Sequence, residues 1–271
     1  MKHAVITGSS SGIGFGLATE FLKNGFSVTI SGKNNEKLNS AGENLIKSFS
    51  KDSVHIQTCD VRSCSDIENL WNSAKNRFGH IDIWVNNAGT GQDFIFIKDF
   101  EEDAINLILD TNIKGVIHAS RIIYNKMSEQ GFGAVYNMEG FGSDGRKMQK
   151  LSIYGTSKSA LSYFTKSFIK ETKQSSVLIG TISPGMVLTD LFLRPSDRDE
   201  KEAKRFLKIT NILADKVETV TPWLVNKMIN NTTHGKSFNW LNSTKVMTRF
   251  ISSLFKKRKL LSLADIRIKK H

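Results

Sequence analysis

The sequence predicts an α/β fold in which helices cover both faces of a doubly wound parallel sheet. Apolar, β-branched runs alternate with stretches of helical periodicity. The runs are almost continuously hydrophobic, as strands are when both faces of their sheet are buried. The predicted strands lie near 3–7, 27–31, 53–58, 81–86, 133–138 and 177–182. The predicted helices lie near 13–24, 35–48, 65–78, 100–128, 153–173 and 217–231.

Composition narrows the class of protein. Of the 271 residues, 39% are hydrophobic and 24% charged, which is ordinary for one soluble domain and excludes disorder, collagen and coiled coil. No apolar run approaches the roughly 20 residues that span a bilayer. Because the first predicted strand starts at residue 3, we expect no cleavable leader and a cytoplasmic location.

Cysteines and histidines give no sign of a metal or a disulfide framework. Cys59 and Cys64 are the only cysteines, and the six histidines have no metal-ligand spacing. We expect no metal.

The net charge of +12 is concentrated at the C-terminal end. From Lys245 onward, the chain contains nine lysines and arginines but only one acidic residue, Asp265. The rest of the chain is only mildly basic, so we expect no nucleic-acid partner. We divide the chain into a domain over 1–242 and a basic extension over 243–271.

The first predicted strand leads directly into a glycine-rich turn, Thr7 to Gly14, and an amphipathic helix follows. Glycines let the backbone turn tightly and approach a pyrophosphate, whose charge then faces the unpaired N–H groups of the helix. In this position the turn indicates dinucleotide binding rather than an ordinary strand-to-helix connection. The expected contacts are Gly8, Ser10, Ser11, Gly12, Ile13 and Gly14.

Further motifs follow in a fixed order. Asp60-Val61 ends the third predicted strand, Asn86-Asn87-Ala88-Gly89 follows the fourth, and Tyr154-x-x-x-Lys158 and Ser183-Pro184-Gly185 come later. With the glycine-rich turn, these motifs resemble the short-chain dehydrogenase/reductase family over about 3–190. The resemblance implies a Rossmann-type fold, an NAD(P)-dependent oxidoreductase and further cofactor contacts. These contacts are Asp60, Val61, Asn86, Asn87, Ala88, Gly89, Tyr154, Lys158, Pro184, Gly185, Val187 and Thr189.

The residues after the second predicted strand favour NADPH over NADH. An acidic residue there would bind the ribose 2′-hydroxyl, whereas a cation accepts a 2′-phosphate. No Asp or Glu precedes Glu36, and Lys33 stands where many NADPH-using relatives carry arginine. A solvated surface lysine is the alternative, because Lys33 lacks the bidentate fork of arginine.

Tyr154 and Lys158 are four residues apart on a predicted helix and therefore share one face. An ammonium near a phenol lowers the phenol pKa, so we expect Tyr154 to exchange a proton with a carbonyl oxygen. The resemblance implies that Lys158 also holds the nicotinamide ribose and that Asn112 steadies a water that relays protons.

One position departs from the family. Most relatives carry a serine thirteen residues before the tyrosine to bind the substrate oxygen, and here Phe141 occupies that place. Glu139 and Gly140 replace two further serines, and Ser143 is the nearest hydroxyl. Either Ser143 serves as the catalytic serine or the site works without one.

This departure is similar to the chlorophyll b reductases, in which an Asn-Met-acidic-Gly-x-Gly-Ser segment also precedes Tyr-Gly-x-x-Lys. The resemblance implies reduction of a formyl group on a large apolar substrate. A lid over about 186–215 would suit such a substrate, because it contains Met186, Leu188, Leu191, Phe192 and Leu193.

The end of the chain leaves two interpretations open. Residues 246–255 combine apolar and polar character, and four basic residues follow. We favour a packed terminal helix with a solvated charged end. Peripheral contact with an anionic membrane is the alternative.

The leading function is an NADPH-dependent reductase of an apolar carbonyl compound. An alcohol dehydrogenase for a steroid or 3-hydroxyacyl substrate and a non-catalytic NADPH-binding sensor are the alternatives. The resemblance also implies a homodimer or homotetramer formed through the helices near 100–128 and 153–173.

Overall fold

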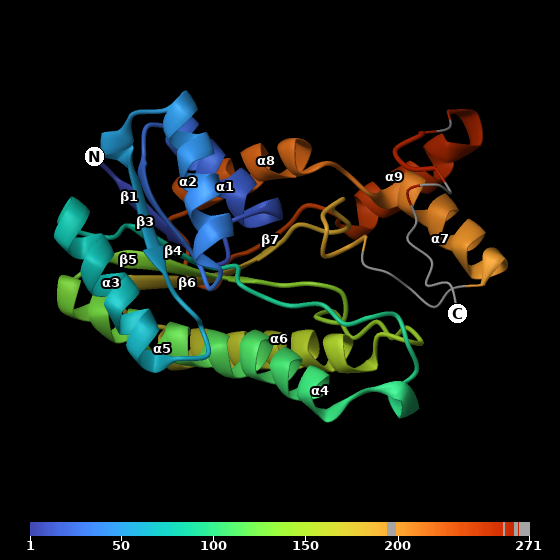
Figure 1. Cartoon of the computed structure of the whole chain (residues 1–271), viewed down its shortest axis with the longest axis horizontal. Coiled ribbons are helices and arrows are strands. Elements are labelled where there is room, and N and C mark those ends of the chain that lie inside the picture. Colours follow the sequence, from blue (N-terminus) through green and yellow to red (C-terminus); the bar gives the residue numbers. More distant parts are fainter. Residues whose placement is uncertain (194–198, 257, 263–264, 266–271) are drawn as a thin grey trace.

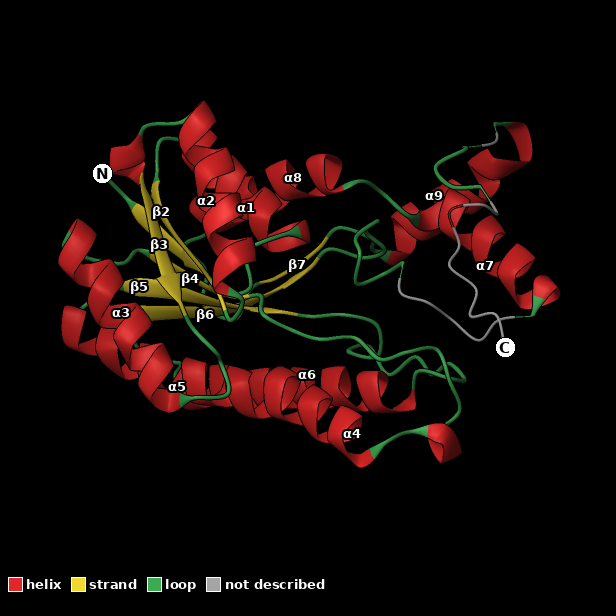
Figure 2. Ribbon diagram, viewed as in Figure 1, coloured by secondary structure: helices red, strands yellow, loops and turns green. Residues whose placement is uncertain are grey.

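The computed structural model describes residues 1–193, 199–256, 258–262 and 265. They contain a seven-stranded, all-parallel sheet with helices on both faces (Figures 1 and 2), which confirms the predicted fold class. The strand order is β3-β2-β1-β4-β5-β6-β7. The strands are β1 (His3–Ile6), β2 (Ser27–Gly32), β3 (Val54–Thr58), β4 (Ile83–Asn86), β5 (Gly133–Met138), β6 (Val177–Ser183) and β7 (Ser237–Asn239).

Helices pack on the sheet in two layers, visible above and below the strands in Figure 2. One layer contains α1 (Gly12–Lys23), α2 (Asn35–Ser48) and α8 (Val217–Ile229). The other contains α3 (Cys64–Phe78), α4 (Glu102–Leu109), α5 (Gly115–Gln130) and α6 (Ser152–Glu171).

Each layer closes its own hydrophobic core against one face of the sheet. Phe21 and Tyr136 are fully buried in the first core, and Trp71 and Trp84 in the second. Successive strand residues point to opposite faces, so Ile6 joins the first core while its neighbour Val5 joins the second. Burial on both sides explains why the strands are hydrophobic throughout.

Three elements differ from the sequence-based expectation. The helix expected near 100–128 is interrupted by a π-helical turn, Asp110–Lys114, between α4 and α5. The polar stretch beyond residue 194, expected as loop, is helical from Glu200 to Leu213 (α7). The short edge strand β7 was not predicted.

Helices α7 and α9 (Ser243–Phe255) lie against each other at one end of the molecule, away from β1 (Figure 1). Residues 194–198 of the predicted lid and most of 263–271 of the basic extension fall outside the described residues. Within the described part of the chain, no helix is both long and apolar enough to cross a membrane. The same residues contain no cluster of three or more potential metal ligands.

Candidate active site

The glycine-rich turn is joined to the segment that follows β4. Thr7 Oγ1 accepts hydrogen bonds from the backbone N–H groups of Asn87 (3.1 Å) and Ala88 (3.0 Å). The Asn87 side chain donates to the carbonyls of Thr7 (2.8 Å) and Gly8 (3.0 Å). A Cβ at Gly8 would lie 2.7 Å from the Cα of Ala88, so only glycine permits this approach. The structure therefore brings these two predicted cofactor segments together.

The N-terminus of α1 is left open toward the turn. Ser11 occupies the N-cap position of α1 without a side-chain cap, as the N-cap residues of α4, α6 and α8 also do. Uncapped N–H groups at a helix N-terminus attract an anion. Beside them lies an open hollow of about 540 Å³. It is lined by Ser10, Ser11, Phe15, Glu36, Lys37, Ser40, Ala41, Asn44 and Asp190. These features fit the pyrophosphate of a dinucleotide.

Three further residues that are predicted to contact the cofactor lie just after β2 and β3. They are Lys33, Asp60 and Val61. Lys33 is exposed just after β2. The Asp60 carboxylate accepts hydrogen bonds from Arg62 Nε (3.0 Å) and Arg62 Nη2 (2.5 Å), and this pair lowers the pKa of Asp60. Val61 is buried against Gly115 at the start of α5.

Asn86 belongs to a buried network rather than to the turn. Its side chain accepts from Trp84 Nε1 (2.7 Å) and donates to Asn137 Oδ1 (2.8 Å). These contacts tie β4 to β5 and leave Asn87 as the amide that reaches the glycine-rich turn. A direct cofactor contact from Asn86 stays a prediction.

Tyr154 and Lys158 lie in the first two turns of α6 and face the end of β5. The Lys158 Nζ lies 5.9 Å from the centroid of the Tyr154 ring and donates to the carbonyl of Met138 at 3.1 Å. A Cβ at Gly140 would lie 2.5 Å from the Tyr154 hydroxyl oxygen and 3.3 Å from Lys158 Cε. The missing side chain at Gly140 is what allows the phenol to reach this place.

Asn112 and Lys158 meet at Gly89. A Cβ on Gly89 would lie 3.2 Å from Asn112 Oδ1 and 3.9 Å from Lys158 Nζ. Asn112 is fully buried, exchanges hydrogen bonds with the backbone of Thr90 and donates to Ser157 Oγ. Its Oδ1 keeps a second lone pair that can hold a water. The structure thus gathers Tyr154, Lys158 and Asn112 around the ends of β4 and β5.

Burial controls the protonation of the pair. It raises the pKa of Tyr154 to about 12. It also lowers the pKa of Lys158 to about 8, against the opposing effect of the Glu139 carboxylate. The expected lowering of the phenol pKa by the ammonium is therefore wrong for this arrangement, because Lys158 donates to Met138 and not to the phenol. At neutral pH Tyr154 carries its proton.

Ser143 holds the turn after β5 in shape. Its hydroxyl accepts from the N–H of Gly140 (3.2 Å) and donates to the carbonyl of Lys158 (3.3 Å). Because a hydroxyl has one proton to donate, Ser143 must release Lys158 before it can donate to a substrate. Its catalytic role stays a prediction.

Sequence reasoning missed Gln92. This buried side chain accepts from the N–H of Tyr154 at 2.6 Å and donates to the carbonyl of Lys150 at 2.7 Å. It thereby binds an otherwise unpaired N–H in the first turn of α6 and sets where the catalytic helix begins. A local sequence pattern could not predict this cap, because Gln92 lies 62 residues before Tyr154 in the chain.

The segment after β6 reaches across the site. Thr189 lies over the glycine-rich turn, since a Cβ at Gly12 would meet its Cγ2 at 3.4 Å. Leu191 lies beside Gly91 in the loop after β4, where the corresponding distance to its Cδ1 is 3.1 Å. Val187 is buried and pairs with Asp215. The segment Ser183–Thr189, called the strap below, contains the predicted contacts Pro184, Gly185, Val187 and Thr189. It leads from the end of β6 to a position over the glycine-rich turn.

Comparison with known proteins agrees with this geometry. The chloroplastic probable chlorophyll(ide) b reductase NYC1 of Oryza sativa subsp. japonica is 34% identical over 268 residues, which cover 93% of this chain and 52% of that protein. The chloroplastic chlorophyll(ide) b reductase NOL of the same organism is 36% identical over 228 residues, covering 82% and 65%. The chain thus spans about half to two thirds of these relatives.

Solved structures show the same fold. A variant of actinorhodin polyketide ketoreductase, solved with NADPH, superposes with a TM-score of 0.78 at 23% identity over 88% of this chain and 95% of that one. The family model described as short chain dehydrogenase matches residues 2–200. On this match and the identities above, the chain belongs to the short-chain dehydrogenase family of NAD(P)-dependent oxidoreductases.

Proposed function

We propose that this protein is an NADPH-dependent reductase of an aldehyde or ketone on a large apolar molecule. The observation that carries the proposal is the convergence of Tyr154, Lys158 and Asn112 beside an open glycine-rich turn. The relatives named chlorophyll(ide) b reductase support a formyl group as the target.

The protonated phenol of Tyr154 is suited to act as the proton donor of a carbonyl reduction. Nicotinamide cofactors supply the hydride in this chemistry. Tyr154, protonated because its pKa is about 12, gives its proton to the carbonyl oxygen as that oxygen becomes an alkoxide. Lys158 and Asn112 lie beside it, and the strap Ser183–Thr189 passes over the glycine-rich turn.

The surroundings of the glycine-rich turn support NADPH. Lys33 follows β2, and Lys37 lines the hollow beside Ser10 and Ser11, so two cations are near the expected 2′-phosphate. The carboxylates of Glu36 and Asp190 line the same hollow and limit the advantage of these cations. Solved relatives bind NADP+, NADPH or NADH, so they support a nicotinamide cofactor without choosing between the two forms.

Two surfaces support the proposed partners. Tyr163 on α6 is 76% exposed, on one of the helices through which family members associate, so we place a homodimer or homotetramer contact there. The second surface is the outer face of α9, which is apolar and next to basic residues, and we propose that it rests on an anionic membrane. A cytoplasmic location stays a prediction.

The central test compares Tyr154→Phe with the unchanged protein. We expect the variant to keep its affinity for NADPH, measured by fluorescence titration, and to lose turnover of a panel of apolar aldehydes that includes chlorophyllide b. Removing a positioned general acid costs about 10²- to 10⁴-fold. Undiminished turnover by the variant would show that Tyr154 is not the acid. Binding of NADPH with no turnover by the unchanged protein would favour the non-catalytic sensor.

A further inference from the structure

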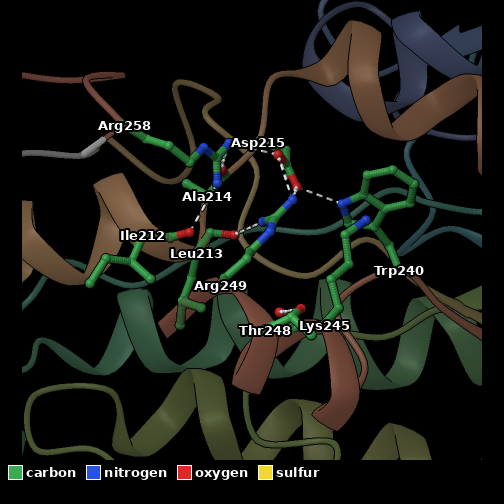
Figure 3. A network of polar contacts seen from close by, with 9 residues as sticks. All are labelled: Ile212, Leu213, Ala214, Asp215, Trp240, Lys245, Thr248, Arg249 and Arg258. Atoms are coloured by element: carbon green, nitrogen blue, oxygen red, sulfur yellow. Dashed lines mark hydrogen bonds and ion pairs between the residues drawn. The ribbon is translucent and has the colours of Figure 1, made fainter. Parts of the chain in front are cut away.

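Asp215 is a buried carboxylate that no step of the proposed reaction uses. It follows α7 and is only 3% exposed. Its oxygens accept hydrogen bonds from Arg249 Nη2 (2.7 Å), Arg258 Nη2 (2.9 Å) and Trp240 Nε1 (2.6 Å), which reach it from separate segments (Figure 3). Burial of a charge is costly unless it is paired and hydrogen-bonded, and this set of donors compensates the carboxylate.

The two arginines also hold the end of α7, the helix within the predicted lid, which is called the lid helix below. Arg249 Nη1 donates to the carbonyl of Leu213 at 2.7 Å. Arg258 donates to the carbonyls of Ile212 (2.9 Å) and Ala214 (2.8 Å), as Figure 3 shows. The last carbonyls of a helix lack partners inside it, and cations there are favoured by the helix dipole. The basic extension therefore fixes the place where α7 ends.

The backbone of Asp215 carries this anchor to the strap over the active site. Its N–H donates to the carbonyl of Met186 at 2.9 Å, and its carbonyl accepts from the N–H of Leu188 at 3.0 Å. These bonds enclose Val187 in a short parallel bridge. Thr189, which lies over Gly12 of the glycine-rich turn, directly follows Leu188 in the chain.

The strap is held at its beginning as well. The N–H of Trp240 donates to the carbonyl of Ser183 at 2.9 Å. A Cβ at Gly185 would lie 2.5 Å from the Cβ of Leu241, so the residue after Trp240 packs directly on the strap. One buried carboxylate thus links the strap, the lid helix and the C-terminal extension.

We propose that Asp215, clasped by Arg249 and Arg258, is a positioning residue that holds the strap Ser183–Thr189 over the bound nicotinamide cofactor. The inference rests on the proposed function for the identity of the cofactor. It makes the first part of the basic extension a component of the active-site architecture, although none of its residues touches the expected reacting atoms.

The test uses arginine variants of the full chain, because loss of the carboxylate would leave two partly buried cations without their shared partner. Arg249→Gln removes the more buried partner, and Arg258→Gln removes one whose side chain is 34% exposed. Lys256→Gln is the matched control, since it removes one positive charge from an exposed position between them. Arg258→Lys keeps the charge while it loses the fork that reaches two carbonyls and the carboxylate.

Two readouts separate positioning from mere stability. We expect Arg249→Gln to weaken NADPH binding about tenfold in a fluorescence titration, as loss of a charged hydrogen bond does. Amide hydrogen exchange in 183–193 should quicken in both glutamine variants, while exchange in 3–14 stays unchanged. Arg258→Lys should lie between Arg258→Gln and the unchanged protein, and Lys256→Gln should match the unchanged protein.

The opposite pattern would refute the clasp. If Arg249→Gln and Arg258→Gln melt at lower temperature but bind NADPH normally and keep slow exchange in 183–193, Asp215 only stabilises the fold. Failure of the unchanged protein to bind NADPH would instead refute the proposed function. In that case the hydrogen-exchange comparison still decides whether the arginines hold the strap.

Discussion

Gly140 decides where the catalytic phenol can lie. The hydroxyl oxygen of Tyr154 occupies space that any side chain at this position would need. Glycine at position 140 is therefore a packing requirement of this site.

A methyl group at Gly140 should therefore disable the enzyme. In Gly140→Ala, the new Cβ would lie 2.5 Å from the Tyr154 hydroxyl oxygen and displace it. We expect a loss of kcat of about 10²-fold and destabilisation of about 1–3 kcal/mol, measured by steady-state kinetics and thermal unfolding.

Gly155→Ala is the control for Gly140→Ala. Gly155 is also beside Tyr154, but a Cβ there meets nothing within 4 Å. Alanine in a helix should stabilise the protein by about 0.5–1 kcal/mol relative to glycine and leave kcat unchanged. Equal activity of the two alanine variants would contradict the packing argument.

Lys158 should set the alkaline limit of the reaction. Burial lowers its pKa to about 8, while the phenol of Tyr154 titrates near 12. If cofactor binding needs the ammonium, kcat/KM for NADPH falls as pH rises through about 8, because the folded free enzyme then loses that charge.

Glu139→Gln tests this assignment. The Glu139 carboxylate favours the charged form of Lys158, so its neutral replacement should lower the pKa of Lys158 further. We expect the alkaline limb of kcat/KM for NADPH to move to lower pH. Asp144→Asn, at an exposed position in the same loop, should leave the limb in place. A limb unchanged in Glu139→Gln would show that another group titrates.

The sequence predicted the residues of the site better than their partners. The turn over Thr7–Gly14 and the pair Tyr154 and Lys158 are local patterns, and the structure brings both to the carboxyl ends of the strands. Gln92 was not predictable, because its partners come from the start of a helix more than 50 residues away. The sign of the pKa shift on Tyr154 was wrong, because burial is a property of the fold and not of the spacing.

At the level of elements, Lys150 connects the catalytic helix to the lid helix. Its side chain is largely buried, and its Nζ lies 2.9 Å from Glu202 Oε2 in α7 and 5.0 Å from the ring centroid of Phe96. Lys150 has a φ of 62° just before α6 begins. A left-handed lysine is unfavourable by about 1–3 kcal/mol unless its surroundings hold it, and these contacts do so.

Glu202→Gln should loosen the lid helix without unfolding it. Glutamine still serves in the capping box with Asp199, so the variant removes only the charge opposite Lys150. Because Glu202 is partly exposed, the loss of stability should stay below about 1 kcal/mol. We expect a higher KM for the carbonyl substrate and faster hydrogen exchange in α7.

Glu200→Gln provides the comparison, because its exposed pair with Lys204 lies within α7 itself. That variant should leave KM unchanged. A similar KM for both variants would show that the contact between Lys150 and Glu202 does not control the lid.

Elements with a strong hydrophobic period in the sequence were predicted, and elements that depend on tertiary contacts were not. The buried strands and α1, α2 and α3 follow the sequence pattern closely. The π-helical turn Asp110–Lys114 is invisible to a 3.6-residue period, although it orients Asn112. The three-residue strand β7 gains its hydrogen bonds only from the neighbouring β6.

At the scale of the whole molecule, exposed apolar side chains gather on α9, which lies beside α7 at one end of the molecule (Figure 1). On α9 the exposed apolar side chains recur at helical spacing, so they share one face. They are Met247, Phe250, Ile251, Leu254 and Phe255. Exposed Lys256 and Lys259 follow directly. Apolar anchors next to cations suit the interface of an anionic bilayer, from which a membrane-dissolved substrate would reach the lid.

Substitutions on this face test membrane contact more cleanly than removal of the extension, because Arg249 and Arg258 belong to the Asp215 clasp. Leu254 and Phe255 are 81% and 87% exposed, so Leu254→Ser with Phe255→Ser should leave the fold intact. The double variant should lose most binding to anionic vesicles in a sedimentation assay, since about 0.8 kcal/mol is forfeited per unburied CH₂.

Phe132→Ser, which removes a partly exposed aromatic ring just before β5, should bind vesicles as the unchanged protein does if α9 alone inserts. Added salt should weaken binding of the unchanged protein, because it screens the attraction between the lysines and the lipid headgroups. Neutral vesicles should bind less than anionic ones for the same reason. If the double variant and the unchanged protein sediment equally with anionic vesicles, the apolar face of α9 does not insert into the bilayer.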